Sequence, residues 1–121
     1  MTRILLIDDE PLVRDVLARL LSAEGHEVLA VDDGSRAVEY VEQGEIELVI
    51  TDLLMPGQEG IETIGALRER WPALPILAIS GGGRLDAIDL LPVARSMGAT
   101  ATLPKPITGT RLREAVAALA P

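Results

Sequence analysis

Five short runs of aliphatic residues, separated by segments with helical spacing, constrain the fold of this chain more than any other feature. The four strongest runs cover residues 3–7, 47–51, 75–79 and 100–103, and a weaker run covers residues 27–31. Most of these runs are apolar without alternation, which is typical of strands that are covered on both faces. The pattern therefore predicts a parallel sheet between two layers of helices.

The segments between the runs carry helix signals. The first begins at Pro11, has six aliphatic residues at helical spacing and stops at Gly25, and Pro at the first position with Gly beyond the last turn is typical of helix ends. We also predict helices at residues 35–43, 60–71, 93–97 and 110–120, with Pro92 as a helix start or kink. Five such units with right-handed crossovers predict an α/β fold, a flavodoxin-like doubly wound five-stranded parallel sheet of order 2-1-3-4-5 with five helices.

The composition excludes several classes of function. Hydrophobic residues make up 48% and charged residues 25% of the chain, and no apolar run is long enough to cross a bilayer. A net charge of −8 argues against nucleic-acid binding, which needs Lys and Arg to neutralise phosphates. Without cysteine there is no disulfide, thiolate nucleophile or cysteine-ligated zinc. Because the N-terminus also lacks a signal-peptide pattern, we expect one cytoplasmic domain over residues 1–121.

Acidic side chains lie at the predicted strand ends where an open parallel sheet binds its ligands. Asp8 and Asp9 end the first strand and Asp52 ends the third, and these two strands are neighbours in the predicted order. Three carboxylates in one crevice repel one another and raise one another's pKa unless a cation shares them. Carboxylate ligands with room for several waters suit Mg²⁺, so the residues predict a magnesium site.

A hydroxyl and an ammonium are predicted on the other side of the same crevice. Ser80 follows the fourth strand and Lys105 follows the fifth. Together with a metal they compensate the charge that spreads over the phosphoryl oxygens during transfer. Since a carboxylate can attack phosphorus to give an aspartyl phosphate, the residues predict phosphoryl transfer to an aspartate.

Four segments in this order closely resemble the receiver domains of bacterial two-component response regulators, and the resemblance covers essentially the whole chain. The segments are Leu-Ile-Asp8-Asp9-Glu, Val-Ile-Thr-Asp52-Leu-Leu-Met55-Pro56-Gly, Ile-Ser80-Gly and Leu-Pro-Lys105-Pro106. The resemblance implies a signalling domain that, with Mg²⁺, accepts a phosphoryl group from a histidine kinase or a histidine phosphotransferase and catalyses only its own phosphorylation and dephosphorylation.

The resemblance also assigns roles around the metal. It implies that Asp52 is the phosphoacceptor and that Asp9 and Asp52 bind Mg²⁺ directly. It further implies that Asp8 orients a metal-bound water and that Leu54 supplies a backbone carbonyl. A magnesium-dependent aspartyl-phosphate phosphatase is the enzymatic alternative, but such enzymes usually carry a second acid two residues after the nucleophile, where this chain has Leu54.

Further roles concern the response to phosphorylation. Ser80 resembles the switch hydroxyl that moves to the phosphoryl group, Lys105 resembles its ion-pair partner, and the bond before Pro106 is typically cis in the family. Thr102 stands where many receivers have Tyr or Phe, so the aromatic switch is missing. Residues 80–83 resemble the subset of receivers with Ser-Gly-Gly-Gly after the fourth strand. We therefore expect phosphorylation to order or reposition the loop over residues 81–92, in the role that the aromatic side chain has in other receivers.

Partner contacts are the least constrained feature. Leu12 and Val16 lie toward one edge of the first predicted helix, and either docking of a kinase or phosphotransferase or packing in the core accounts for them. The downstream protein partner is not identified, and a monomer or weak dimer is expected, with no nucleic acid and no membrane as partner. The chain is a stand-alone regulator, a phosphorelay shuttle or a module of a larger regulator or hybrid kinase. A degenerate receiver that signals without phosphorylation is disfavoured because the acceptor residues are all present.

Overall fold

The computed structural model describes residues 1–53, 59–80 and 90–120 of the chain. Five parallel strands form one sheet in the order β2-β1-β3-β4-β5, which confirms the predicted topology. The strands are β1 (Arg3–Ile7), β2 (Glu27–Val31), β3 (Leu48–Asp52), β4 (Ile76–Ser80) and β5 (Ala101–Pro104). The helices are α1 (Pro11–Ala23), α2 (Ala37–Gly44), α3 (Glu59–Arg70), α5 (Leu90–Met97) and α6 (Gly109–Leu119).

The observed bounds differ from the predicted ones by small shifts. The strands β3, β4 and β5 each lie one residue later along the chain than their aliphatic runs predict. The helix α5 begins at Leu90, three residues before the predicted Val93, and Pro92 lies within its first turn. The first-turn position tolerates proline because the backbone N–H groups there have no intrahelical acceptor.

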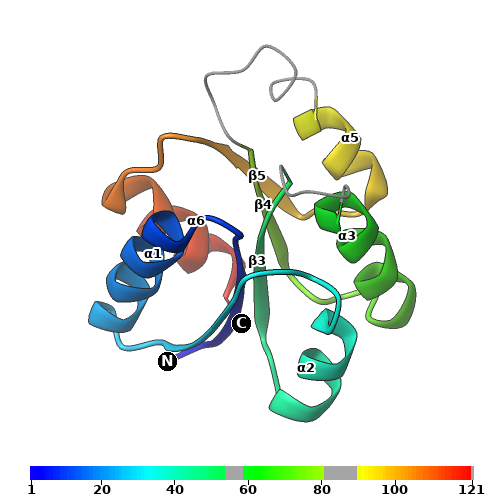
Figure 1. Cartoon of the computed structure of the whole chain (residues 1–121), viewed down its shortest axis with the longest axis horizontal. Coiled ribbons are helices and arrows are strands. Elements are labelled where there is room, and N and C mark those ends of the chain that lie inside the picture. Colours follow the sequence, from blue (N-terminus) through cyan, green and yellow to red (C-terminus); the bar gives the residue numbers. More distant parts are fainter. Residues whose placement is uncertain (54–58, 81–89, 121) are drawn as a thin grey trace.

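The helices cover the sheet in two layers. Figure 1 shows α1 and α6 on one face of the sheet and α2, α3 and α5 on the other. Alternate residues of the central strands point to the two layers, so each face has its own buried cluster. The cluster under α1 and α6 includes Ile4, Leu17 and Leu112, and the cluster under α2 and α3 includes Leu5, Val41 and Ile64.

The central strands are more buried than the edge strands. All residues of β3 and β4 are buried, because a parallel sheet between two helical layers leaves its central strands no contact with water. The edge strands β2 and β5 have mostly half-buried and exposed residues. Among the described helices, none combines the length and the apolar character needed to cross a membrane.

Two helices begin near the carboxyl edge of the sheet. Pro11 is the first residue of α1, and the backbone carbonyl of Glu10 accepts a hydrogen bond from the Arg14 N–H at 2.9 Å. The side chain of Thr108 caps α6 by accepting a hydrogen bond from the Arg111 N–H at 3.1 Å. Both helices therefore begin at the edge where the strands end.

Candidate functional site

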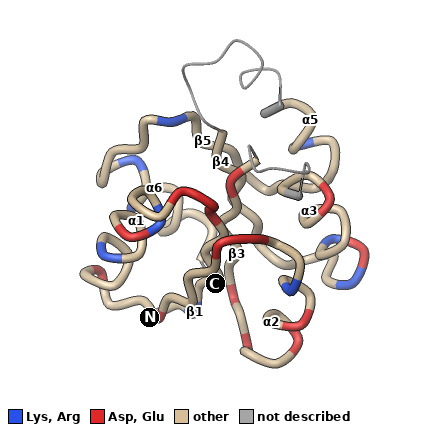
Figure 2. Tube along the Cα trace, viewed as in Figure 1, with Lys and Arg blue, Asp and Glu red and all other residues tan. Residues whose placement is uncertain are grey.

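Four of the predicted site residues meet at the carboxyl edge of the sheet. Asp8 follows β1, Asp52 ends β3, Ser80 ends β4 and Lys105 follows β5. These strands are neighbours and run parallel, so their ends lie at one edge. Figure 2 shows acidic residues at this edge near the start of α1 and the end of β3.

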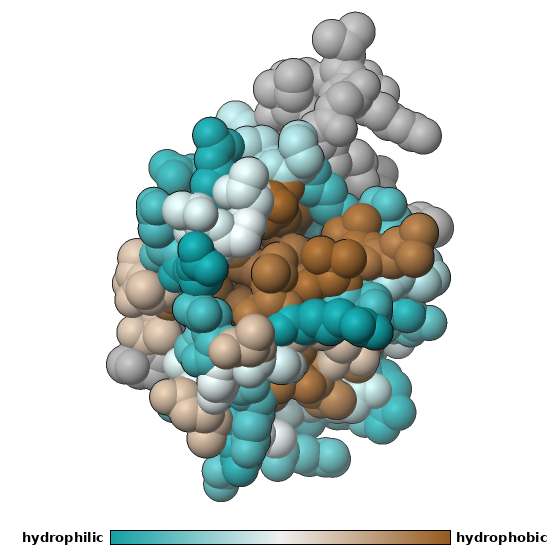
Figure 3. All heavy atoms as spheres, turned by 90° about the vertical axis from the view of Figure 1, so that its left-hand side faces the viewer, coloured by the Kyte–Doolittle hydropathy of each residue, from teal (hydrophilic) through white to brown (hydrophobic). Residues whose placement is uncertain are grey.

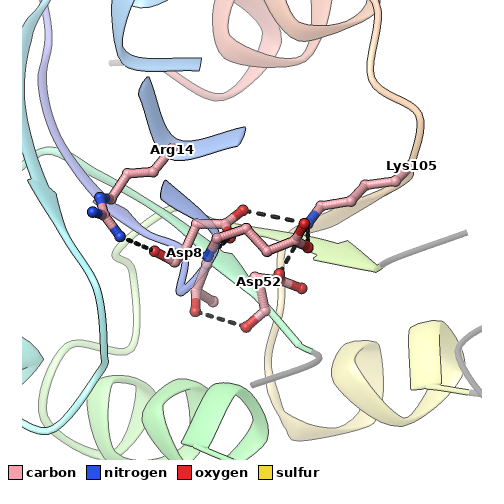
Figure 4. A network of polar contacts seen from close by, with 6 residues as sticks. Asp8, Arg14, Asp52 and Lys105 are labelled. Atoms are coloured by element: carbon pink, nitrogen blue, oxygen red, sulfur yellow. Dashed lines mark hydrogen bonds and ion pairs between the residues drawn. The ribbon is translucent and has the colours of Figure 1, made fainter. Parts of the chain in front are cut away.

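The ammonium of Lys105 is held by three carboxylates. Its Nζ donates a hydrogen bond to Asp52 Oδ2 at 2.9 Å and lies 3.3 Å from Asp8 Oδ2 and 3.2 Å from Glu10 Oε1. Figure 4 shows the side chains of Asp8 and Asp52 pointing toward Lys105. The side chains of Asp8 and Asp52 are each 1% exposed and that of Lys105 is 12% exposed, whereas the Glu10 carboxylate reaches solvent.

Burial and charge act in opposite directions at this site. Burial raises the pKa of Asp8 above its usual value, although the Glu10 backbone N–H and the charge of Lys105 both favour the carboxylate. For Lys105, burial lowers the pKa, but the hydrogen bond and charge of Asp52, with Asp8 and Glu10, outweigh burial and raise it. Lys105 therefore stays protonated, and Asp8 bears an electrostatic cost that further positive charge would relieve.

The acidic residues fit a divalent cation. One carboxylate oxygen from each of Asp8, Asp9, Glu10 and Asp52 lies within 4.8 Å of the others. The buried Oδ1 of Asp9 accepts no hydrogen bond within the described part of the chain, and the buried Oδ2 of Asp8 has the ion pair with Lys105 at 3.3 Å but accepts no hydrogen bond there. Buried anionic oxygens that lack hydrogen bonds are costly, and a hard cation with oxygen ligands satisfies them. The donor set therefore suits Mg²⁺.

The local chain around Asp8 holds its carboxylate in place. Asp8 Oδ1 accepts a hydrogen bond from the Glu10 N–H at 2.9 Å, and the Asp8 carbonyl accepts one from Arg14 Nη1 at 2.8 Å. Figure 4 shows Arg14 approaching Asp8 from the side opposite Lys105. Neither Glu10 nor Arg14 was predicted as a site residue. The signal for Glu10 was its place directly after the acidic pair, and that for Arg14 was a cation in the first turn of the helix that follows it.

Ser80 ends β4, and Thr102 lies within the neighbouring strand β5. Ser80 is buried, and its carbonyl accepts a hydrogen bond from the Lys105 N–H at 2.7 Å, which ties the end of β4 to the residue after β5. Thr102 is half-buried and pairs in register with Ala78. The peptide bond between Lys105 and Pro106 is cis. The predicted ligand Leu54 and the residues 81–89 of the predicted responsive loop lie outside the described residues.

A glycine lets α3 approach Asp52. A Cβ built on Gly60 would clash with the Asp52 carbonyl oxygen and would lie 2.7 Å from the Cα of Leu53. Both contacts are with backbone, which cannot rotate away as a side chain can. Gly60 therefore permits the first turn of α3 to pack directly against the end of β3, where Asp52 lies.

An apolar groove adjoins the site on the α1 side. Leu12 and Val16 are 82% and 55% exposed, whereas Leu17 and Leu21 of the same helix are buried in the core. For Leu12 and Val16, the sequence allowed either docking of a partner or packing in the core. Their exposure excludes packing in the core. Figure 3 shows apolar side chains gathered on the face that carries α1 and α6. The groove of about 410 Å³ is lined by Leu12, Val13, Val16, Leu17, Lys105, Pro106 and Ile107.

Comparisons with known proteins agree with this arrangement. The response regulator receiver domain family matches residues 4–117 of the chain. Response regulator protein FleR of Pseudomonas aeruginosa is 35% identical over 115 residues, covering 95% of this chain and 24% of FleR. Transcriptional regulatory protein CpxR of Escherichia coli is 33% identical over 112 residues, covering 93% of this chain and 46% of CpxR.

Solved structures give the same result. The crystal structure of a response regulator receiver domain protein from Clostridium thermocellum matches with a TM-score of 0.87 and 28% identity, covering 98% of this chain and 94% of that one. Both relatives are longer proteins, and the chain spans only 24% of the length of FleR and 46% of the length of CpxR. The likeness therefore concerns one domain of each of these relatives.

Proposed function

The chain belongs to the response regulator receiver domain family of two-component signalling, and we propose that Asp52 accepts a phosphoryl group from a histidine kinase or a histidine phosphotransferase. The observation that carries this proposal is the buried carboxylate of Asp52, 2.9 Å from the ammonium of Lys105. Asp52 supplies the nucleophilic oxygen, and Lys105 supplies a positive charge beside it.

The transfer is a displacement at phosphorus. An oxygen of Asp52 forms a bond to the phosphorus of the phosphohistidine, and the bond between phosphorus and the imidazole nitrogen breaks. The imidazole leaves with the electron pair and takes up a proton from solvent when it is released as a neutral ring. Lys105 compensates the charge on the phosphoryl oxygens, and the hydroxyl of Ser80, at the end of the neighbouring strand, donates a hydrogen bond to one of them.

Mg²⁺ is the proposed cofactor. Asp9 and Asp52 would hold it directly, Asp8 would orient a water bound to it, and the Leu54 carbonyl would complete the protein ligands. When bound, the cation supplies positive charge for the phosphoryl oxygens. The donor set supports this assignment, because two buried oxygens of Asp8 and Asp9 accept no hydrogen bond among the described residues.

Intact mass after incubation with acetyl phosphate and Mg²⁺ tests the acceptor. One phosphoryl equivalent per chain is expected, with none on Asp52→Asn. Asp15→Asn is the matched control, because Asp15 lies on the surface of α1 and forms an ion pair with Arg19 at 3.0 Å. Full loading of Asp52→Asn would contradict the assignment. Release of phosphate from small esters in many turnovers would instead favour the phosphatase alternative, and an unmodified wild type would favour a degenerate receiver.

The groove beside α1 is the proposed docking site for the phosphodonor protein, because exposed Leu12 and Val16 border Lys105 there. Leu12→Ser is expected to slow phosphotransfer from the cognate kinase and to leave loading by acetyl phosphate unchanged. Leu29→Ser, which removes an exposed leucine from the edge strand β2, is the control. Equal slowing by both variants, or by neither, would exclude this groove as the docking site.

The proposed setting is the cytoplasm, where the protein acts as a monomer or weak dimer, either alone, as a relay shuttle or as part of a larger regulator. In this proposal, Lys105 links binding of the phosphoryl group to a movement of β5 and α6. The loop over residues 81–92, and not the side chain of Thr102, changes its conformation in response. Amide exchange with and without beryllofluoride, together with Lys105→Ala, tests this coupling. Unchanged exchange over residues 81–92 would contradict the role of that loop.

A further inference from the structure

We propose that Arg68 locks the C-terminal end of α5 to α3 and to the start of β5, so that phosphorylation of Asp52 leaves this end fixed. The proposal rests on the proposed function, because it concerns a part of the molecule that keeps its conformation when Asp52 is phosphorylated. Gly98 and Thr100 precede β5 and therefore lie at the amino edge of the sheet, opposite the acidic group.

The guanidinium of Arg68 joins the ends of two helices. Its Nε and Nη2 donate to the Gly98 carbonyl at 3.0 and 2.7 Å, just after the last residue of α5. Its Nη1 donates to the carbonyls of Trp71 and Pro72 at 2.9 and 2.8 Å, just after the end of α3. The last carbonyls of a helix lack intrahelical donors and carry a partial negative charge, so one cation satisfies both ends.

The same side chain reaches the sheet through Thr100. Arg68 Nη2 donates to Thr100 Oγ1 at 3.4 Å, and this oxygen also accepts a hydrogen bond from the Ile76 N–H at 3.0 Å. The Thr100 N–H in turn donates to the Ile76 carbonyl at 2.8 Å. The start of β4, the approach to β5 and the ends of α3 and α5 thus share one network.

Glycines allow the two helices to come this close. Gly98 has φ +117°, and a Cβ there would lie 2.8 Å from the Arg68 Cγ. A Cβ on Gly65 would lie 3.2 Å from the Cε of Met97, so α3 and α5 also touch one turn away from the network. A side chain at Gly98 would press on the stem of Arg68 and strain the backbone at this positive φ, so the hydrogen bonds to the Gly98 carbonyl depend on glycine at this position.

The planar guanidinium matters as well as its charge. Five hydrogen bonds to four acceptor oxygens need a donor with several fixed N–H groups, and a lysine ammonium presents a single point of charge. Arg68→Lys is therefore expected to keep the charge and lose most of the bridging. Arg70 is a matched control on the same helix, because it is exposed, pairs with the Glu42 carboxylate at 2.8 Å and lies over the Trp71 ring.

Amide hydrogen exchange tests the proposal in the full chain with Mg²⁺. The N–H groups of Gly98, Ala99 and Thr100 are the reporters, since they donate to the carbonyls of Arg95, Ala94 and Ile76 at 2.8–3.1 Å. In the wild type, beryllofluoride is expected to change their exchange rates less than twofold. In Arg68→Gln they are expected to exchange at least tenfold faster and to become sensitive to beryllofluoride. Arg68→Lys is expected to give an intermediate result that is still measurable if Arg68→Gln does not fold.

Several outcomes overturn the proposal. Strong changes of these amides in the wild type with beryllofluoride would show that this end of α5 does respond. Equal exchange in Arg68→Lys and Arg70→Gln without beryllofluoride would show that Arg68 does not lock it. Failure of the wild type to bind beryllofluoride would refute the proposed function and the claim about phosphorylation, while the rates without it still decide whether Arg68 locks the helix end.

Discussion

Replacement of Lys105 by methionine isolates the electrostatic role of the ammonium, because methionine fills similar space without charge. At an effective dielectric constant of about 20, a unit charge at 2.9 Å from Asp52 attracts it by about 6 kcal/mol, and one at 3.3 Å from Asp8 by about 5 kcal/mol. Much of this attraction offsets the loss of hydration of the three groups. Removing one partner of a buried ion pair costs about 3–5 kcal/mol.

The lower end of this range applies here, because the third carboxylate, that of Glu10, reaches solvent. We therefore expect the free energy of unfolding of Lys105→Met to fall by about 3 kcal/mol at neutral pH without divalent metal. At about 4 °C per kcal/mol for a domain of this size, the Tm falls by about 12 °C. Urea unfolding followed by the fluorescence of Trp71, the only tryptophan in the chain, measures the change.

The pH dependence gives the sign of the effect. Burial raises the folded-state pKa of Asp8 above its unfolded value, so the folded protein binds a proton at a pH where the unfolded chain does not. Removing Lys105 takes away a charge that favours this carboxylate, which raises the folded pKa further. The deficit of Lys105→Met is therefore largest above the folded pKa and shrinks as the pH falls through it.

Mg²⁺ and a control variant complete the test. Mg²⁺ at 100 times its Kd adds about 2.7 kcal/mol to a protein that binds it, and the metal is expected to reduce the deficit because it supplies the missing positive charge. Arg19→Met removes a cation from an exposed pair with Asp15 and is expected to cost less than about 1 kcal/mol. A loss below about 1 kcal/mol for Lys105→Met, or a deficit independent of both pH and Mg²⁺, would refute the reasoning.

Three further predictions concern the surroundings of the site. Glu10→Gln removes one of the carboxylates that contact Lys105, the only lysine of the chain. The ammonium is then more available to an anion, so beryllofluoride is expected to bind several-fold more tightly. Unchanged or weaker binding in a titration would contradict this. Gly60→Ala is expected to lower the free energy of unfolding by about 1–3 kcal/mol, measured in urea, because its methyl group would meet the backbone of Asp52. Hydrogen bonds from Ser35 to the Asp33 carboxylate lower the pKa of Asp33. Ser35→Ala removes the hydroxyl donor and is therefore expected to raise this pKa in a carboxyl NMR titration. The stabilisation that the hydrogen bonds provide is lost as the pH falls through the lowered pKa.

The sequence by itself determined the fold class, the strand order and which charged residues lie together at the carboxyl edge of the sheet. Aliphatic runs report strands covered on both faces, and a parallel sheet brings the residues that follow its strands to one edge. For this reason Asp8, Asp52 and Lys105 were predicted together although they are far apart in the chain. The topology converts the order of the segments into proximity, so local patterns were sufficient.

Only the tertiary structure decided which neighbours complete that edge. Glu10 belongs to a run of acids that ordinarily lies in water, and its contact with Lys105 depends on how β5 approaches α1. Leu12 and Val16 have the same helical spacing as core residues, and only the position of α1 on the sheet leaves them exposed.

The bridge made by Arg68 is the clearest case of structure adding what sequence lacks. Four of its five hydrogen bonds go to main-chain carbonyls of residues three to 30 positions away, and a carbonyl gives no sign in the sequence of being available. Every residue has one, and whether it lacks a donor depends on where helices end and how closely they pack. Side-chain chemistry at strand ends can therefore be inferred from the sequence, whereas contacts with the main chain require the packed structure.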